Sequence, residues 1–365
     1  MSQIIPWATP CFWGEERKHI NQALDSNWIS GGSYLDKFET QIKTFLNTKH
    51  VHAVSNGTTA IHAAFLSINV TKNDEVILPG FGYMAAANIA IQLGAIPKFC
   101  DVDHSTWNPT ADTIEKCISK RTKAIVVIHN YGNMCDMDPI IKLGMRYKIP
   151  IIEDSAESFG SKYNDRASGT IGDIGTFSFH ATKTITTGEG GAVVCKNKEI
   201  SKKIKLIRSH GVDKKRYWHL IAGHNFRMTN FQAAMGFGQM EKIDTIIKKK
   251  LELYDFYKYN LNNIEGISFQ KITPKSFPII WAVGVKIDKK AFSKSRDKII
   301  SELLQKKIET RRAFYSSEEL VHLYGKNEVP NSVKLSKSLI SLPSSPILTK
   351  KQISYICDTL QKMKR

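Results

Sequence analysis

Two stretches of the sequence carry side chains suited to imine chemistry. Lys183 is the one lysine of a turn rich in Thr and Gly that joins two short expected strands. Upstream, the apolar and largely β-branched run 149–152 leads into Glu153 and Asp154. A lysine amine forms an imine with an aldehyde, and a strand-end acid keeps a pyridine nitrogen protonated, so that the ring accepts electrons. The pair therefore predicts a pyridoxal 5'-phosphate (PLP) site, although a single lysine would more often be a solvated loop residue.

A phosphate site is expected further upstream. Residues 52–62 read as a strand, a tight Asn-Gly turn and the start of a helix. Backbone amides at a helix N-terminus bind anions, and the alternative is an ordinary helix cap by Ser55 or Thr58. The suspected phosphate cofactor favours the anion site. Ser178 alternates with the phenylalanines on either side of it, so it faces the opposite way and is placed to reach a phosphate.

The elements around these residues alternate between strand and helix. The expected strands are 75–78, 96–101, 124–128 and 150–153, and the expected helices between them are 84–93, 110–117 and 139–147. Runs of Val and Ile are typical of strands buried on both faces, so this alternation predicts a mainly parallel sheet between helices. In such sheets active-site residues gather at the carboxyl ends of the strands. Both Asp154 and the 55–58 turn lie at such ends.

The second part of the chain predicts a smaller α+β domain. From residue 230 the pattern is helical almost to residue 261, with possible breaks around the glycines 236 and 238. The expected division is therefore 1–240, an N-terminal arm and a large domain, and 241–365, a linking helix and a small domain. Within the small domain we expect a strand at 279–285 and helices at 296–307 and 349–363.

Composition excludes few functions. The net charge of the 365-residue chain is +18, which would suit nucleic acid, but the lysines are spread along the chain and no aromatic–basic interleaving or zinc spacing accompanies them. We therefore expect a solvated surface, no nucleic-acid partner and no metal. The six cysteines lack CxxC spacing, and no apolar run suits a signal peptide or a membrane span. These features predict a cytoplasmic protein with free thiols.

Taken together, the motifs make the family recognisable. The sequence resembles the DegT/DnrJ-type family of PLP-dependent nucleotide-sugar aminotransferases over nearly its whole length. Within that family it looks most like perosamine and viosamine synthases, which place an amine at C4 of a nucleotide-linked 4-keto-6-deoxyhexose with glutamate as donor. The narrower likeness rests on residues 28–30 and on the 216–230 loop. The motifs that carry the resemblance are residues 28–30, 54–60, 153–157, 177–191, 225–230, 308–311 and 342–344.

The resemblance implies the fold of aspartate aminotransferase (fold type I) and a homodimer with two shared active sites. Lys183 would bind the cofactor as an imine and transfer protons, and Asp154 would pair with the pyridinium nitrogen. Glu157 would lie near the ring hydroxyl, and Tyr83 would stack on the ring. The implied phosphate ligands are Gly57, Thr58 and Ser178, with Asn225 of the other subunit, and the implied substrate contacts are Trp28, Ser30, His180, Glu189 and Arg311.

The sequence departs from the family in two places. After Arg311 many members have Pro and then a Tyr-Pro-x-His run, whereas 312–318 of this chain has no counterpart of that His. The substrate contacts there are expected to differ. Gly80 and Gly82 stand where larger residues are usual, which predicts a looser pocket around Tyr83.

Three other functions remain open. One is amination at C3, and a second is a catalytically silent basic scaffold, or a nucleic-acid-binding regulator, on the same fold. The third is 3-dehydration, and Lys183 argues against it because that subgroup carries His at this position.

Overall fold

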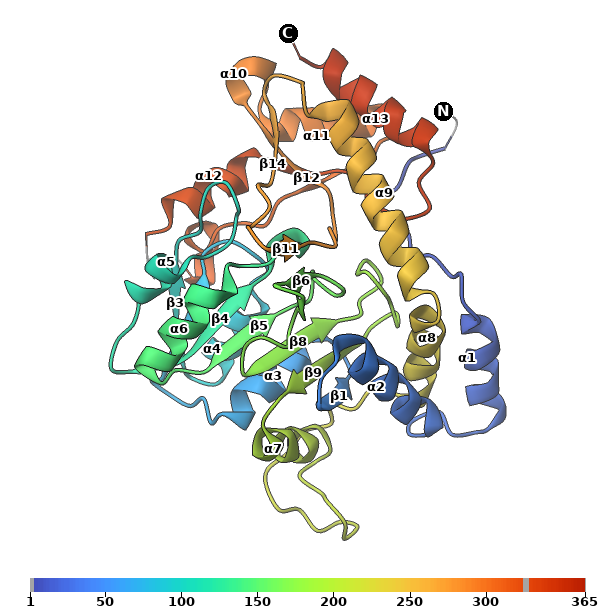
Figure 1. Cartoon of the computed structure of the whole chain (residues 1–365), viewed down its shortest axis with the longest axis vertical. Coiled ribbons are helices and arrows are strands. Elements are labelled where there is room, and N and C mark those ends of the chain that lie inside the picture. The colour runs from blue at the N-terminus through green and yellow to red at the C-terminus, as the bar shows by residue number, and fades with distance from the viewer. Residues whose placement is uncertain (1–2, 324–327, 365) are drawn as a thin grey trace.

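A seven-stranded sheet forms the centre of the protein in the computed structural model, which describes residues 3–323 and 328–364 (Figure 1). Strand order is β1-β9-β8-β5-β4-β2-β3. Because β9 pairs antiparallel with both β1 and β8, it alone in this sheet runs against the others. The expected mainly parallel sheet is thereby confirmed. Its strands are β1 (His50–Val54), β2 (Glu75–Pro79), β3 (Ile96–Cys100), β4 (Thr122–Ile128), β5 (Ile151–Asp154), β8 (Ile174–Ser178) and β9 (Gly191–Cys195).

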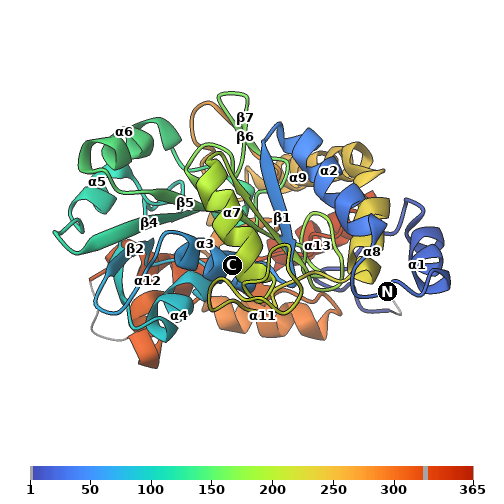
Figure 2. The same ribbon diagram turned by 90° about the horizontal axis from the view of Figure 1, so that it is seen from below.

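Helices cover both faces of this sheet (Figure 2). The alternation of side chains along β4 shows how: Val126 packs with α3, α4 and α7, whereas Ile125 and Val127 face α5 and α6. Toward β1 and β9 the second face is covered by α2 and α8, and α1 packs against α8. These helices are α1 (Glu16–Asp25), α2 (Ser33–Leu46), α3 (Gly57–Ser67), α4 (Ala85–Gln92), α5 (Ala111–Glu115), α6 (Met137–Tyr147), α7 (Lys198–Arg208) and α8 (Asn230–Met240).

The C-terminal part forms a second layer of strands and helices at the top of Figure 1. Its four-stranded sheet has the order β10-β12-β14-β13. The N-terminal arm joins it, because Ile5 bridges to Ile308 and lies in its core. The expected division after residue 240 stays a prediction. The elements are α9 (Ile243–Leu261), β10 (Ile267–Phe269), β12 (Gly284–Ile287), α10 (Lys289–Phe292), α11 (Arg296–Gln305), β13 (Arg311–Arg312), α12 (Pro330–Ser338), β14 (Leu339–Ser341) and α13 (Lys350–Lys362).

Short elements link the two parts. A three-stranded sheet joins β11 of the C-terminal part to a hairpin of the N-terminal part. No helix of the described residues is long and apolar enough to span a membrane. The short elements are β6 (Lys162–Tyr163), β7 (Arg166–Ala167), β11 (Ser276–Phe277), η1 (Asn130–Gly132), η2 (Ser317–Glu319) and η3 (Val321–Leu323).

The helix expected over 230–261 is two helices, and the predicted position of its breaks is wrong. The chain leaves the helix at Glu241 and Lys242, between α8 and α9. Gly236 instead allows close packing: a Cβ there would lie 2.6 Å from the Phe38 ring of α2. This glycine serves the contact between two helices and leaves α8 intact.

The strand expected over 279–285 is also mostly wrong. In the structure β12 begins at Gly284, and the residues before it have partners outside any strand ladder. Ile279 N–H donates to Ser161 Oγ and Trp281 N–H to the Tyr131 carbonyl. The apolar run is buried between the two parts of the chain, and burial alone does not distinguish a strand from an extended linker.

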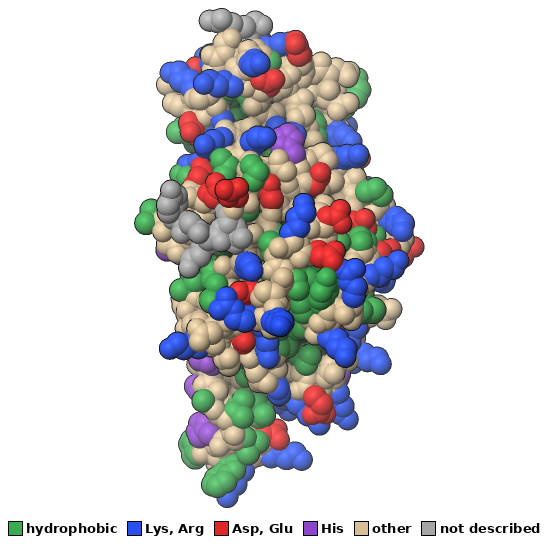
Figure 3. Space-filling view, turned by 90° about the vertical axis from the view of Figure 1, so that its left-hand side faces the viewer, with side chains coloured by type: hydrophobic (Ala, Val, Ile, Leu, Met, Phe, Trp, Pro, Cys, Tyr) green, Lys and Arg blue, Asp and Glu red, His purple; other side chains and the backbone are tan. Residues whose placement is uncertain are grey.

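Basic side chains are scattered over the face that Figure 3 shows, with acidic ones among them. On this face the blue side chains form no continuous stripe of the kind that tracks a nucleic-acid backbone.

Candidate active site

The predicted residues meet at the carboxyl ends of neighbouring strands. Asp154 ends β5, Ser178 ends β8, and β1 leads into the N-terminus of α3. A cavity of about 680 Å³ opens there. Nine of the residues predicted for the site line it: Gly57, Thr58, Tyr83, Asp154, Glu157, Ser178, His180, Lys183 and Glu189. Since these residues are spread over some 130 positions of the chain, it is the sheet that brings them together.

The turn between β8 and β9 presents Lys183 to this cavity. The backbone N–H of Lys183 donates to the His180 carbonyl at 2.9 Å, which closes the turn. The side chain is 14% exposed, and its Nζ lies 3.6 Å from Glu157 Oε1. The same Nζ lies 3.9 Å from the centre of the Trp281 ring. An acid and an aromatic face therefore hold the amine at the cavity wall.

Two buried carboxyl groups lie near this amine. Asp154 accepts a hydrogen bond from Ala156 N–H at 3.1 Å, and Glu157 accepts one from Tyr131 N–H at 2.8 Å. Burial raises the pKa of both carboxyl groups, and the Lys183 charge partly opposes that rise. Each carboxylate would be stabilised by a cationic or hydrogen-bonding group placed in the cavity.

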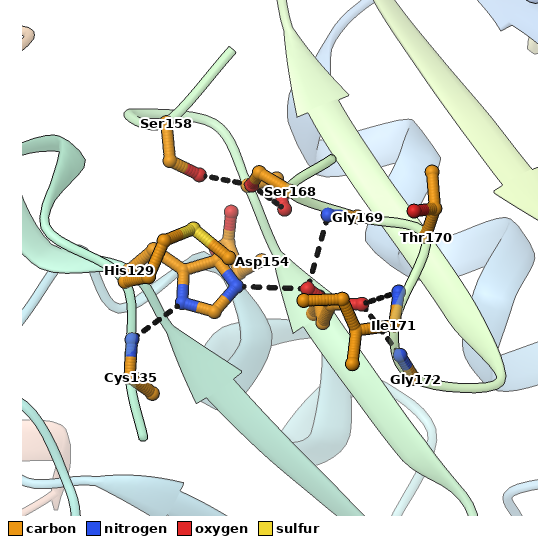
Figure 4. Close-up of polar contacts among 12 residues, drawn as sticks. His129, Cys135, Asp154, Ser158, Ser168, Gly169, Thr170, Ile171 and Gly172 are labelled. Carbon is orange, nitrogen blue, oxygen red and sulfur yellow. Dashed lines mark hydrogen bonds and ion pairs between the residues drawn. The ribbon is translucent and has the colours of Figure 1, made fainter. Parts of the chain in front are cut away.

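Behind Asp154, a polar network anchors strand β5 (Figure 4). The Glu153 carboxylate forms hydrogen bonds with His129 and with the amides of Gly169, Ile171 and Gly172. Because Glu153 and Asp154 are adjacent on a strand, they point to opposite faces. Glu153 thus holds the scaffold while Asp154 faces the cavity.

The N-terminus of α3 forms the opposite end of the cavity. Asn56 and Thr59 close a capping box, with Asn56 Oδ1 accepting from Thr59 N–H at 2.8 Å. The amides of Gly57 and Thr58, in the first turn, have no intrahelical acceptor. A Cβ at Gly57 would lie 2.8 Å from Ser178 Cβ, so only glycine allows α3 to approach β8 this closely. The arrangement is a cradle for an anion.

An aromatic wall that the sequence did not reveal completes the cavity. Trp7 of the N-terminal arm, Trp281 and Phe314 all line it. Trp7 and Trp281 meet edge to face at 5.7 Å, and Trp281 and Phe314 lie parallel at 6.4 Å. These residues are isolated in the sequence and follow no recognisable spacing. A hint for Phe314 was its place in the 312–318 segment that departs from the family.

Four predicted residues do not line this cavity. Trp28 is 70% exposed, and it lies with Ser30 in the loop before α2. Asn225 pairs with Ser209 beside α7. Arg311 is nearer, because its guanidinium lies 5.9 Å from the Trp7 ring and forms an ion pair with Glu309. The roles expected of these four residues stay predictions.

The expectation of a looser pocket at Gly80 and Gly82 is not met. A Cβ on Gly80 would lie 2.7 Å from Val329, and one on Gly82 would lie 2.8 Å from Ile128. Gly82 also has a φ of +142°, which disfavours other residues. Both glycines are required by close packing, so they leave no extra space beside Tyr83.

The donor set of the cavity fits PLP from end to end. The amine of Lys183 matches the aldehyde, and the buried Asp154 matches a protonated pyridine nitrogen. The Gly57 cradle, with the Thr58 and Ser178 hydroxyls, matches a phosphate. All of these groups line the same cavity.

Comparison with known proteins gives the same assignment. The DegT/DnrJ/EryC1/StrS aminotransferase family matches residues 10–361. Two proteins named GDP-perosamine synthase are similar along their whole length. The one from Escherichia coli O157:H7 is 39% identical, with 99% of this chain and 98% of that protein covered. The one from Vibrio cholerae is 38% identical, with 98% of each chain covered.

A solved structure agrees in fold. The crystal structure of DesI in the presence of its TDP-sugar product superposes with a TM-score of 0.93 at 25% identity, covering 99% of this chain and 93% of that one. The expected fold type I architecture is confirmed. The chain therefore belongs to the DegT/DnrJ/EryC1/StrS aminotransferase family, and it is a PLP-dependent nucleotide-sugar aminotransferase, as its sequence predicts.

Proposed function

We propose that the protein transfers the amino group of L-glutamate to C4 of a GDP-linked 4-keto-6-deoxyhexose, which yields a GDP-4-amino-4,6-dideoxysugar of the perosamine type. One observation carries the proposal: the Lys183 amine lies in one cavity with two buried carboxyl groups and an anion cradle. The choice of C4 and of GDP is supported by the relatives named GDP-perosamine synthase.

PLP supplies an aldehyde that takes up the amino group and a ring that delocalises the electron pair left after proton removal. Lys183 would hold the cofactor in the resting enzyme. Asp154 would keep the pyridine nitrogen protonated, Glu157 would bind the ring hydroxyl, and Tyr83 would lie against the ring. The phosphate would be held by the Gly57 and Thr58 amides and by the hydroxyls of Thr58 and Ser178.

Lys183 is also placed to move the proton. In the first half-reaction it would take the proton from the α-carbon of glutamate, whose amino group stays with the cofactor while one water is consumed and 2-oxoglutarate leaves. In the second it would give a proton to C4 of the sugar, which gains the amino group and loses its keto oxygen as water. Trp7, Trp281 and Phe314 line the same cavity and would narrow the access of water to this amine.

The outer contacts are part of the same proposal. His180 and Glu189 line the cavity, with His180 Nε2 3.8 Å from Glu189 Oε1, and would contact the substrate. Arg311, whose guanidinium lies near the Trp7 ring, would contact the substrate from that side of the cavity. Asn225, Trp28 and Ser30 lie away from the cavity of their own chain, which supports a homodimer in which Asn225 completes the partner's phosphate site. The free cysteines support a cytoplasmic location.

The test is a product assay with purified enzyme, PLP and glutamate. GDP-, UDP- and dTDP-linked 4-keto-6-deoxyhexoses are offered separately, and products are identified by mass spectrometry and proton NMR. A 4-amino product from the GDP sugar is the expected result. A 3-amino product would refute the C4 assignment, and a preference for UDP or dTDP would refute the nucleotide. A protein that binds no PLP would favour the silent scaffold.

A further inference from the structure

A second lysine lies behind the wall of the active-site cavity. Lys250, in α9, is only 4% exposed, and its Nζ donates a hydrogen bond to the Trp281 carbonyl at 3.0 Å. Among the described residues, no acidic side chain pairs with it. A buried amine without an acidic partner costs free energy that an apolar side chain would not. Its presence next to the cavity therefore calls for a role.

Trp281 connects this lysine to Lys183. Its indole Nε1–H donates to the carbonyl of Thr182 at 2.7 Å, and Thr182 directly precedes Lys183. Its ring lies against the Lys183 ammonium, with 3.9 Å from Nζ to the ring centre. Trp281 therefore holds both the backbone and the side chain of the Lys183 turn. Its own backbone lies in the irregular segment before β12, where no strand ladder fixes it: its N–H donates to the Tyr131 carbonyl at 3.0 Å, and its carbonyl accepts from Lys250.

We propose that Lys250 is a positioning residue for Lys183: by holding the Trp281 backbone from behind, it fixes the indole that orients the cofactor lysine. The proposal rests on the function proposed above for Lys183. Lys183 and Lys250 also line one small cavity of about 20 Å³.

The contact of Lys250 with Trp281 does not depend on the charge of Lys250. Burial lowers the pKa of Lys250 to about 8, and the Lys183 charge acts in the same direction while Cys11 opposes it. Cys11 of the N-terminal arm and Lys183 are the titratable groups that line the small cavity with Lys250. A neutral amine still donates a hydrogen bond, so the contact with Trp281 persists as pH rises through 8, whereas the positive charge facing Lys183 is lost.

The experiment measures how fast Lys183 captures the cofactor. PLP is added to the apoprotein, and absorbance in the blue reports the carbon–nitrogen double bond that forms between Lys183 Nζ and the aldehyde with release of one water. Lys250→Met keeps the length of the side chain without its donor. Lys248→Met, at an exposed position of α9, is the matched control. Trp281→Phe keeps a ring but removes the donor to Thr182.

We expect Lys250→Met to slow capture about 2- to 10-fold, the effect of one hydrogen bond. Lys248→Met should match the wild type. Combining Lys250→Met with Trp281→Phe should slow capture little more than Trp281→Phe alone, because both act through the indole. A wild-type rate in Lys250→Met, or single effects that multiply in the double variant, would overturn the proposal.

Two further measurements keep the result clear. If Lys250→Met does not fold, Lys250→Gln takes its place. Because glutamine retains a neutral donor, Lys250→Gln should capture PLP at a rate near that of the wild type. A capture rate as low as that of Trp281→Phe would contradict the proposal. Lys183→Ala must abolish the blue absorbance. If that absorbance survives in Lys183→Ala, the function proposed for Lys183 is wrong. If it is lost in Lys183→Ala but Lys250→Met captures PLP at the wild-type rate, only the proposal for Lys250 is wrong.

Discussion

His129 Nε2 lies 2.9 Å from Glu153 Oε2, and both side chains are fully buried beneath the active site (Figure 4). The other ring nitrogen, Nδ1, accepts a hydrogen bond from Cys135 N–H at 3.1 Å, so the ring proton is on Nε2 and is donated to Glu153. Glu153 also accepts from the amides of Gly169, Ile171 and Gly172. One carboxylate therefore fixes the 169–172 loop against β5, the strand that ends at Asp154.

Replacing this carboxylate should destabilise the fold. Burial raises the pKa of Glu153, but the hydrogen bonds from His129 and the loop amides outweigh it, so its pKa is lowered and it stays ionised. In Glu153→Gln an NH₂ group must face another donor, which leaves at least one buried donor unpaired. We expect a loss of about 1–3 kcal/mol in the free energy of unfolding, measured by urea titration of the apoprotein. Glu252→Gln, an exposed site on α9, should change it little.

Lys183→Ala should abolish transamination but leave the fold and the cavity in place. The amine is expected to act both as the cofactor's attachment point and as the proton carrier, so turnover should fall by at least about 10²–10⁴-fold. Binding of pyridoxamine phosphate, followed by its absorbance after gel filtration, should persist because the Asp154 and Gly57 contacts remain. Substantial turnover in this variant would show that another residue moves the proton.

Gly57→Ala should weaken binding at the phosphate end. The new Cβ would lie 2.8 Å from Ser178 Cβ, so α3 and β8 must move apart, at a cost of about 1–3 kcal/mol. Affinity for PLP, measured by equilibrium dialysis, should fall accordingly. Gly31→Ala is the control, since a Cβ there meets no atom within 4 Å. Unchanged affinity in Gly57→Ala would place the phosphate elsewhere.

His52 should make stability depend on pH. Burial lowers the pKa of His52 from 6.5 to about 3, and the Arg208 charge adds to this. The unfolded chain takes up a proton near pH 6.5 while the folded chain does not, so stability is complete above that pH and falls as pH drops toward 3. The slope is at most about 1.4 kcal/mol per pH unit. The free energy of unfolding is measured by urea titration at pH 7 and at pH 5, and its difference between the two pH values should be smaller in His52→Gln than in the wild type.

The central chemistry followed from local patterns. Lys183 and Asp154 lie in a turn and at a strand end, and the strand–helix alternation predicted the parallel sheet that joins them. Parallel strands place their carboxyl ends at one edge, so residues far apart in the sequence had to meet there. The same rule placed the 55–58 turn, and the alternation of side chains along the strand placed Ser178. The cofactor site was predictable for this reason, whereas the family and fold type I followed from the resemblance of the motifs.

Only the tertiary structure revealed the walls of the site. Trp7, Trp281 and Phe314 come from an arm, a linker and a loop, whose paths depend on long-range packing rather than on periodicity. For the same reason, the strand at 279–285 and the break in the 230–261 helix were predicted at the wrong positions. Buried apolar runs and closely packed glycines occur in several backbone conformations, so neither identifies one conformation from the sequence. The contact of Lys250 with Trp281 depends on that linker. Sequence by itself therefore determined the chemistry of the cavity, and the fold decided how its lysine is held.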